Sequence, residues 1–317
     1  MLVYLFKRLT MTIAVLLLVV VFLSLIVHIV PGDPARTILG PRASPETIEM
    51  VRASMDLDQP VYIQLGRFLR NLLRGDLGTD VFTGRSINTM VADALPHTIA
   101  LAFSGLGLAI LLGIPLGIYS ATNPDSWMDR FTALISISLI TIPSYVAGLF
   151  LLIIFSVELQ ILPAIGTGSL DDPVDYLMRL ILPSVALAGT WIGYIARLVR
   201  TSLMEIMNEN YIRTARAGGI SERLIRYKYA LKNAIIPTVA VLGVGMGSLM
   251  GGAVFVEVVF SRTGMGTLIF TAITNRNFPV VRAGVLVIAF LFVLINFLVD
   301  LIYTYLDPRI QLDKVRG

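Results

Sequence analysis

Six long runs without Asp, Glu, Lys or Arg constrain the fold of this chain more than any other feature. They cover residues 9–30, 98–121, 131–157, 180–196, 234–256 and 283–299. A helix needs about 20 mainly apolar residues to cross a bilayer core, where the backbone must satisfy its own hydrogen bonds. The fourth and sixth runs are short, so we expect their helices to extend past Arg197 and Asp300, whose polar ends can snorkel. The sequence therefore predicts an all-α, polytopic membrane protein with six transmembrane helices.

The composition fits a membrane protein without thiol chemistry. Only 15% of the residues are charged, and cysteine is absent, whereas soluble domains are about a quarter charged. The first run follows Lys7 and Arg8, as a signal peptide would. It is longer than a normal signal core, and residues 31–34 (PGDP) are not a small-x-small cleavage site. We interpret this run as an uncleaved first span.

The distribution of basic residues predicts that both termini are cytoplasmic, since cytoplasmic loops carry an excess of Lys and Arg. The chain then divides into a cytoplasmic N-terminus with the first helix (1–30), a periplasmic loop with short helices (31–96), a five-helix transmembrane core (97–306) and a cytoplasmic tail (307–317). The core includes a cytoplasmic loop at 197–233, which holds eight Lys or Arg against three Glu.

The outer loop carries helix signals. Ser44-Pro45-Glu46 is a favourable helix start, with Ser as N-cap and Pro at the first helical position. Five apolar residues then recur at helical spacing and predict one apolar face: Val61, Leu65, Phe68, Leu69 and Leu72. Residues 75–78 (GDLG) predict a turn.

The fifth apolar run has glycines at four-residue spacing. Gly243, Gly247 and Gly251 share one helical face, with Gly252 nearby, and small residues let another helix approach closely. Packing within this chain and an interface with a partner subunit that lines a path are both open.

The loop at 197–233 predicts a helix, a sharp turn and a second helix. Residues 201–217 lack Pro and Gly and can form one helix, and Gly218-Gly219 would end it, because glycine accepts the left-handed conformation. Ser221 can cap the second helix, and Pro237 marks a kink or re-entry into the membrane. Arg213 and Arg216, three residues apart, share a face. A basic loop that only fixes topology and binds anionic headgroups is the alternative, but that role needs no such turn.

Two stretches of this loop resemble a known family. Residues 211–219 read YIRTARAGG and residues 231–237 read LKNAIIP, which resembles the EAA-type loop of ABC-importer permeases. The resemblance is greatest to the branch for dipeptides and oligopeptides, which also includes permeases for glutathione, nickel and some opines or sugars. Gly218 stands where that branch usually has Lys, and Arg213-Thr214-Ala215 occupies the Glu-Ala-Ala positions, with Gly219 as the glycine.

Further elements of the same family follow in order along nearly the whole chain. They are PGDPA at 31–35, LDQP at 57–60, GDLG at 75–78, a pattern at 250–266 that contains Glu257 and has Thr263 where Pro is common, and LDPR at 306–309.

The resemblance implies a type I ABC importer permease fold in the bacterial cytoplasmic (inner) membrane. In that family two paralogous six-helix permeases form one alternating-access pathway, two ATPase subunits bind below them, and an extracytoplasmic solute-binding protein delivers the solute. ATP binding would close the ATPase pair and push a coupling segment of the permease, and hydrolysis would reset it. Carried over to this chain, the coupling segment is Tyr211, Ile212, Arg213, Thr214, Ala215, Arg216, Ala217, Gly218, Gly219 and Ile220.

The residues independently predict that the chain is not an ATPase. A P-loop needs a Lys directly after a glycine, and none of the four lysines follows one. We expect no cofactor and no metal in this chain, with ATP and Mg bound by the partner subunits, and no nucleic-acid partner.

Two other classes of function remain open but are disfavoured. An ion-coupled secondary transporter usually keeps ionisable groups within its spans, and only His28 and Asp300 lie near the span ends. A membrane enzyme would need converging catalytic groups, and His28 and His97 stand in no metal or triad spacing.

The solute and the pathway are less constrained by the sequence. Glu257 could contact the solute or the binding protein, or pair with Arg262 or Arg282. Trp191, Tyr194 and Phe255 could line a path, although membrane aromatics more often pack or anchor. Peptide is the expected solute, followed by glutathione and then nickel or an opine.

Overall fold

The structure, a computed structural model, describes residues 2–29, 43–54, 58–169 and 171–306. The regular elements among these residues are helices, with one isolated bridge between Thr79 and Ser86 and no strand, which confirms the all-α prediction. The predicted tail at 307–317 and the motifs at 31–35 and 307–309 lie outside this part of the chain. The fold divides into two compact units, residues 1–98 with 262–293 and residues 99–261 with 294–317.

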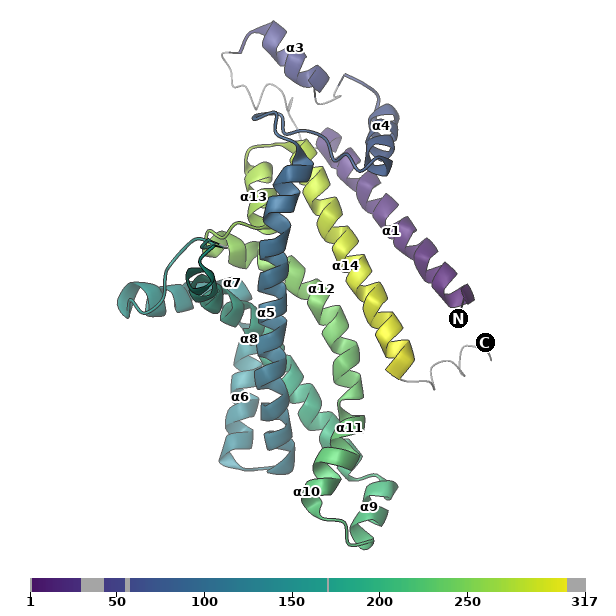
Figure 1. Cartoon of the computed structure of the whole chain (residues 1–317), viewed down its shortest axis with the longest axis vertical. Coiled ribbons are helices and arrows are strands. Elements are labelled where there is room, and N and C mark those ends of the chain that lie inside the picture. Colours follow the sequence, from purple (N-terminus) through teal and green to yellow (C-terminus); the bar gives the residue numbers. More distant parts are fainter. Residues whose placement is uncertain (1, 30–42, 55–57, 170, 307–317) are drawn as a thin grey trace. The chain divides into compact units, whose positions relative to one another are not determined.

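The first unit contains the outer-loop helices. Its elements are α1 (Leu2–Ile29), α3 (Pro45–Ser54), α4 (Val61–Leu73), the first part of α5 (Ile87–Thr122), α13 (Met265–Thr274) and the first part of α14 (Phe278–Leu306). Ser44 caps α3 as predicted, because its hydroxyl accepts the Thr47 N–H at 3.2 Å. The apolar face of α4 buries Phe68 against Val20 of α1 and Leu286 of α14, and α4 lies beside α1 (Figure 1).

Asp80 ties the loop before α5 to the turn between α13 and α14. Its carboxylate is buried and accepts the N–H groups of Phe82 at 3.2 Å and Thr83 at 3.3 Å, the Thr83 hydroxyl and the Asn277 side-chain amide. Burial alone would raise the pKa of Asp80, but these hydrogen bonds outweigh it and hold the pKa below its ordinary value.

The second unit is built around α8. Its elements are the rest of α5, α6 (Trp127–Thr141), α7 (Ser144–Leu151), the π-helix η1 (Leu152–Glu158), α8 (Pro173–Met207), α9 (Asn210–Ala217), α10 (Glu222–Leu224), the π-helix η2 (Ile225–Ala230), α11 (Leu231–Ala234), α12 (Ile236–Val259) and the end of α14. Asp172 starts α8 by accepting the N–H groups of Val174 and Asp175. The helix then runs past Arg197, as predicted, and buries Leu187 against Leu249 of α12.

Close backbone contacts at glycine fix α5 and α6 against α8, and α5 and α6 form a helical hairpin (Figure 1). A Cβ added at Gly193 of α8 would lie 2.6 Å from the carbonyl oxygen of Ser136 in α6. One added at Gly117 of α5 would lie 2.6 Å from that of Ala196 in α8. These distances leave no room for a side chain, so the glycines set how closely the helices pack.

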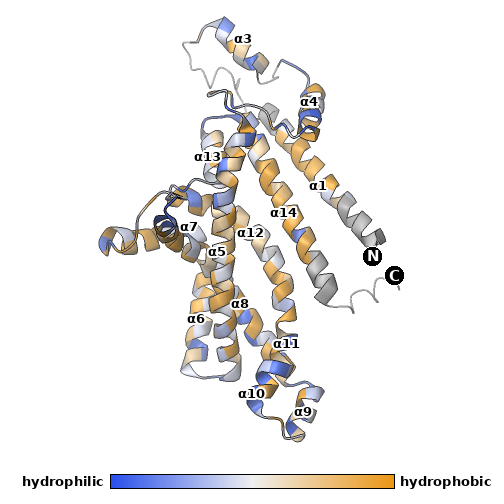
Figure 2. Ribbon diagram, viewed as in Figure 1, coloured by the Kyte–Doolittle hydropathy of each residue, from blue (hydrophilic) through white to orange (hydrophobic). Residues whose placement is uncertain are grey.

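By length and composition, α5, α8 and residues 278–299 of α14 could each cross a membrane. Two bent pairs raise the number to five among the described residues: α6 with α7–η1, bent by 105°, and 222–243 with 245–259, bent by 44°. The first predicted span lies in α1, of which residues 10–25 count as a shorter apolar helix, so the sixth span stays a prediction. Apolar residues line α6, α7 and α12, whereas hydrophilic ones gather in α9 and α10 (Figure 2).

We expect Asp80 to make the loop before α5 sensitive to acid. A carboxyl whose pKa is depressed by folding stabilises the fold fully above its unfolded pKa, about 4, and loses that contribution as the pH falls through the folded value. The protection factors for hydrogen exchange at the Phe82 and Thr83 amides should therefore fall below about pH 4. In Asp80→Asn these amides should be less protected at neutral pH, and their protection should depend little on pH. The same acid dependence in both proteins would contradict the assignment.

Replacing Gly193 by Leu should separate α8 from α6. Overpacking of this kind costs about 1–3 kcal/mol, more than the gain of up to about 1 kcal/mol in helix propensity. We expect a lower melting temperature in detergent. Gly107→Leu is the control, because no atom lies within 4 Å of a Cβ added at Gly107, and it should melt no lower than the wild type.

Candidate functional site

The chain turns sharply after α8. The predicted single helix over residues 201–217 is wrong, because α8 ends at Met207 and α9 begins at Asn210. Asn208 stops α8, and its side-chain amide donates to the carbonyl of Met204 at 3.0 Å. Glu209 is extended, with ψ of 150°. The break folds α9 back so that Ile212 reaches the end of α8. This is a tertiary contact, which local helix propensity cannot predict.

Ile212 anchors the segment to the rest of the unit. Its side chain is fully buried in a cluster with Leu203 of α8 and with three residues that follow the turn: Ile225, Ala230 and Ala234. Ile118 and Ala121 at the end of α5 pack against this cluster. Burial of a side chain of this size stabilises by about 1.5–3 kcal/mol, so α9 is fixed to both α5 and α8.

The Gly-Gly pair ends α9 as predicted, and the two glycines are not equivalent. Gly218 has an ordinary φ of −75°, whereas Gly219 adopts the left-handed conformation with φ of +79°. The Gly219 N–H donates to the Arg216 carbonyl at 3.1 Å, and the Ile220 N–H donates to the Ala215 carbonyl at 3.2 Å. This is the Schellman arrangement, and it makes Gly219 the residue that the turn requires.

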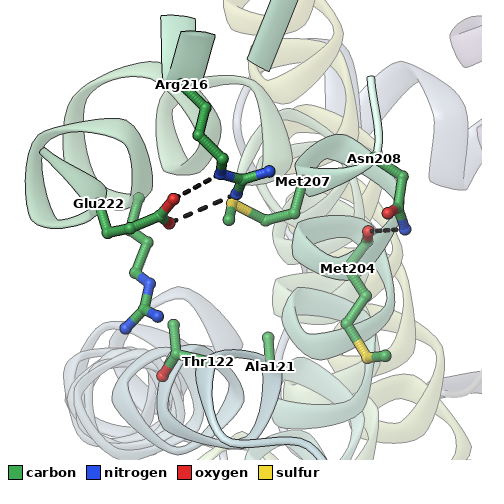
Figure 3. Close-up of a pocket in the computed structure, with 8 residues that line it drawn as sticks. Ala121, Thr122, Met204, Met207, Asn208, Arg216 and Glu222 are labelled. Atoms are coloured by element: carbon green, nitrogen blue, oxygen red, sulfur yellow. Dashed lines mark hydrogen bonds and ion pairs between the residues drawn. The ribbon is translucent and has the colours of Figure 1, made fainter. Parts of the chain in front are cut away.

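Arg216 and Glu222 close the turn from its two sides. The guanidinium Nε lies 2.5 Å from Glu222 Oε1, and the two side chains point toward one another (Figure 3). Ser221 stands at the N-cap of α10, but its side chain makes no capping hydrogen bond, so the predicted side-chain cap is wrong. Sequence analysis missed the ion pair, although opposite charges six residues apart across a Gly-Gly turn were a signal for it. Solvent screens exposed pairs of this kind, so the pair sets the geometry of the turn more than its stability.

A hollow of about 300 Å³ lies beside this pair, at the end of α5 (Figure 3). Its lining combines charged and thioether side chains: Ala121, Thr122, Met204, Met207, Asn208, Arg216, Glu222 and Arg226.

The second motif of the loop returns to the first. The Asn233 amide donates to the Tyr211 hydroxyl at 2.9 Å, so the YIRTARAGG and LKNAIIP stretches form one surface. Pro237 lies in the first turn of α12, where its missing N–H costs nothing. The exposed face of α9 carries Tyr211, Arg213, Thr214 and Ala217.

The glycine face of α12 has two environments. A Cβ added at Gly243 would overlap Val299 of α14, and one added at Gly252 would lie 3.4 Å from Leu187 of α8. Gly247 is buried. In contrast, no atom lies within 4 Å of a Cβ at Gly251. Packing within the chain accounts for Gly243, whereas Gly251 faces open space.

The remaining predicted residues do not gather at one place. Glu257 is fully buried. Trp191 stacks edge-on with Tyr194 at 5.8 Å, and the exposed Phe255 lies 5.8 Å from Tyr145. The side chains of His28 and Asp300 lie outside the described part. Among the described residues no cluster of three His, Asp or Glu side chains could hold a metal.

The fold matches that of a solved transporter. The helices are similar to a chain of the inward-facing MetNI methionine ABC transporter, with a TM-score of 0.57 and 20% identity over 69% of this chain and 96% of that one. This likeness defines a type I ABC importer permease fold.

Sequence comparisons give the family. The family described as "Binding-protein-dependent transport system inner membrane component" matches residues 113–312, and its N-terminal companion matches residues 1–102. The chain therefore belongs to the binding-protein-dependent inner membrane components, the permease subunits of ABC importers.

Three relatives are similar over almost their whole length. A probable D,D-dipeptide transport system permease of Escherichia coli K12 is 41% identical over 92% of both chains. A dipeptide permease of Alkalihalophilus pseudofirmus is 38% identical over 98% of this chain and all of its own. A glutathione permease of Salmonella paratyphi A is also 38% identical, over 98% of this chain and 99% of its own.

Replacing Gly219 by Ala should distort the turn, whereas Gly218→Ala should not. A left-handed conformation costs a residue with a Cβ about 1–2 kcal/mol, and Gly218 lies outside that region with its nearest neighbour 3.4 Å from an added Cβ. We expect both variants to insert at wild-type levels and only Gly219→Ala to lose most of its ATP-dependent uptake, as measured in vesicles that contain the whole transporter. Normal uptake by Gly219→Ala would contradict a role for this turn in coupling.

Proposed function

We propose that this permease pairs with a paralogous permease to form an alternating-access pathway for dipeptides and oligopeptides, driven by two ATPase subunits through residues 211–220. The observation that carries the proposal is the segment's construction. It has a buried base at Ile212, a glycine-ended tip at Gly219 and an exposed basic face at Arg213. A flexible topogenic loop would need none of these three features.

The segment suits the transmission of force. When the ATPase pair closes on ATP, a groove that grips α9 would push it, and the Ile212 cluster would pass the displacement to α5 and α8. Hydrolysis would reverse it. The hollow beside Arg216 and Glu222 offers a recess for a side chain of the ATPase. ATP and Mg belong to those subunits, and this chain would hold no cofactor and perform no hydrolysis itself.

The proposed orientation places residues 197–233 and both termini in the cytoplasm of a bacterium, with residues 31–96 as the periplasmic loop that faces the solute-binding protein. The excess of Lys and Arg on the inside segments supports this assignment. The open face at Gly251 would then meet the partner permease or line the path.

Peptide is the proposed solute because relatives that cover nearly the whole chain are named as dipeptide permeases. Glutathione is a second candidate, since a relative with 38% identity is named for it. Both are peptides with a free amino group and carboxylates, so one pathway chemistry could serve either.

Reconstitution tests the function. The permease, its paralogue, the two ATPases and the solute-binding protein are placed in liposomes, and uptake of labelled dipeptide and of labelled glutathione is measured with ATP. We expect dipeptide uptake that requires ATP and the binding protein, with glutathione slower by about tenfold, equivalent to about 1.4 kcal/mol.

Two outcomes would contradict the proposal. Uptake by this chain alone, abolished by an uncoupler while ATP persists, would indicate a secondary transporter. Uptake that is faster for glutathione than for every dipeptide tested would keep the importer and replace the solute.

A further inference from the structure

An ion pair between a buried carboxylate and a half-buried guanidinium joins α6 to α8 close to the coupling segment. Asp129 lies in the first turn of α6, and Arg200 lies about two turns before the end of α8. The Arg200 guanidinium donates from Nε to Asp129 Oδ1 at 2.7 Å and from its terminal nitrogen to Oδ2 at 2.8 Å. The Asp129 side chain is only 6% exposed. Two parallel charge-assisted bonds fix orientation as well as distance.

The same carboxylate also holds the end of α5. The Ser120 hydroxyl donates to Asp129 Oδ1, and the backbone N–H of Asp125, in the turn between α5 and α6, donates to Oδ2 at 3.1 Å. Ser126 caps the helix by accepting the Asp129 N–H at 3.1 Å. One side chain therefore connects three helices at one end of the bundle.

Close contacts at glycines also prevent the three helices from sliding along one another. The glycine contacts at Gly117 and Gly193 bring α5 and α6 into backbone contact with α8. A Cβ added at Gly113 of α5 would likewise lie 3.1 Å from the carbonyl oxygen of Ile192 in α8. A displacement of one helix along another would drive backbone into side chain. The ion pair and the glycines thus constrain the same three elements at different depths.

The coupling segment is attached to the same block. Ile212 of α9 packs on Leu203 of α8, and the cluster includes Ile118 of α5. The sharp bend of 105° between α6 and α7, at residues 142–143, lies at the opposite end of α6 from Asp129.

We propose that Asp129 and Arg200 are positioning residues for energy coupling: they clamp the ends of α5, α6 and α8 so that these ends move with residues 211–220 as one rigid body. The inference rests on the proposed function of that segment. A pair that served stability alone would be replaceable, because apolar residues of similar volume in place of a buried ion pair are often neutral or stabilising.

The test compares Asp129→Asn, which keeps the shape and removes the charge, with the double variant D129L/R200M, which fills the site with apolar side chains. Each is reconstituted with the ATPases, the partner permease and the binding protein, and the ATP hydrolysed per dipeptide imported is measured. We expect both to raise this ratio at least fivefold, with D129L/R200M present at wild-type abundance. Asp93→Asn is the control, because it breaks an ion pair with Arg85 at 2.5 Å whose side chains are more than half exposed, and its ratio should be unchanged.

A second measurement tests the rigid body directly. The chain has no cysteine, so spin labels can be attached at cysteines introduced for the exposed Asn123 and Asn210. The distance between the labels should be the same without nucleotide and with ATP bound. In D129L/R200M the distribution of label distances should be broader.

The outcomes separate the two proposals. A wild-type ratio in D129L/R200M, or a label distance that changes with ATP in the otherwise wild-type chain, would overturn the clamp while import still supports the function. Absence of ATP-dependent import by the wild-type complex would overturn the proposed function and the clamp together.

Discussion

The constraint on which the rest of this structure depends is that peptide groups in hydrocarbon must pair within their own segment. It makes each apolar run a helix. Polar side chains and unpaired backbone groups are therefore confined to the helix ends and loops, where they can bind water or one another. Asp129, which pairs with Arg200, lies at the start of α6, and the Asp80 hydrogen bonds lie in the loop before α5. The segment after α8 lies outside the long apolar helices, and this is where we propose that the ATPase subunits dock.

Helix contacts then convert this constraint into a defined bundle. Lipid offers no hydrophobic gain when two apolar helices meet, so close packing must supply the attraction. Gly117 and Gly193 provide it by bringing backbones together. At α9, which we propose to lie outside the lipid, burial of Ile212 in a cluster shared with α5 and α8 has the same effect. Motion of one element is consequently transmitted to its neighbours, which is the property that an ATP-driven pathway requires.

Local rules predicted the features that are encoded locally. Absence of charge placed the apolar helices, the spacing on α4 placed Phe68 inward, and the glycine pair at 218–219 ended α9. The break at Asn208 was not predictable in this way, since residues 201–217 contain neither Gly nor Pro. The break is stabilised by a tertiary contact, the packing of Ile212 on Leu203.

Contacts between distant residues lay further out of reach. Asp129 and Arg200 are separated by 71 residues, and no periodicity joins them. Tyr211 and Asn233 belong to two motifs that the family resemblance placed in one loop, but their hydrogen bond depends on how η2 and α11 return the chain. The candidate segment itself was found from its charge, its turn residues and the resemblance, whereas its geometry required the fold.

The Schellman turn at Gly218 and Gly219 has a consequence for evolution. The tip of this turn exposes main-chain atoms and has no side chains at its two glycines. An ATPase that docks there, as proposed, would therefore recognise the shape of the turn and not particular side chains. Neighbouring positions are then free to drift while the contour persists. Under this proposal, one ATPase would fit permeases whose other residues have diverged. A permease would then be able to change its solute without a change in the ATPase.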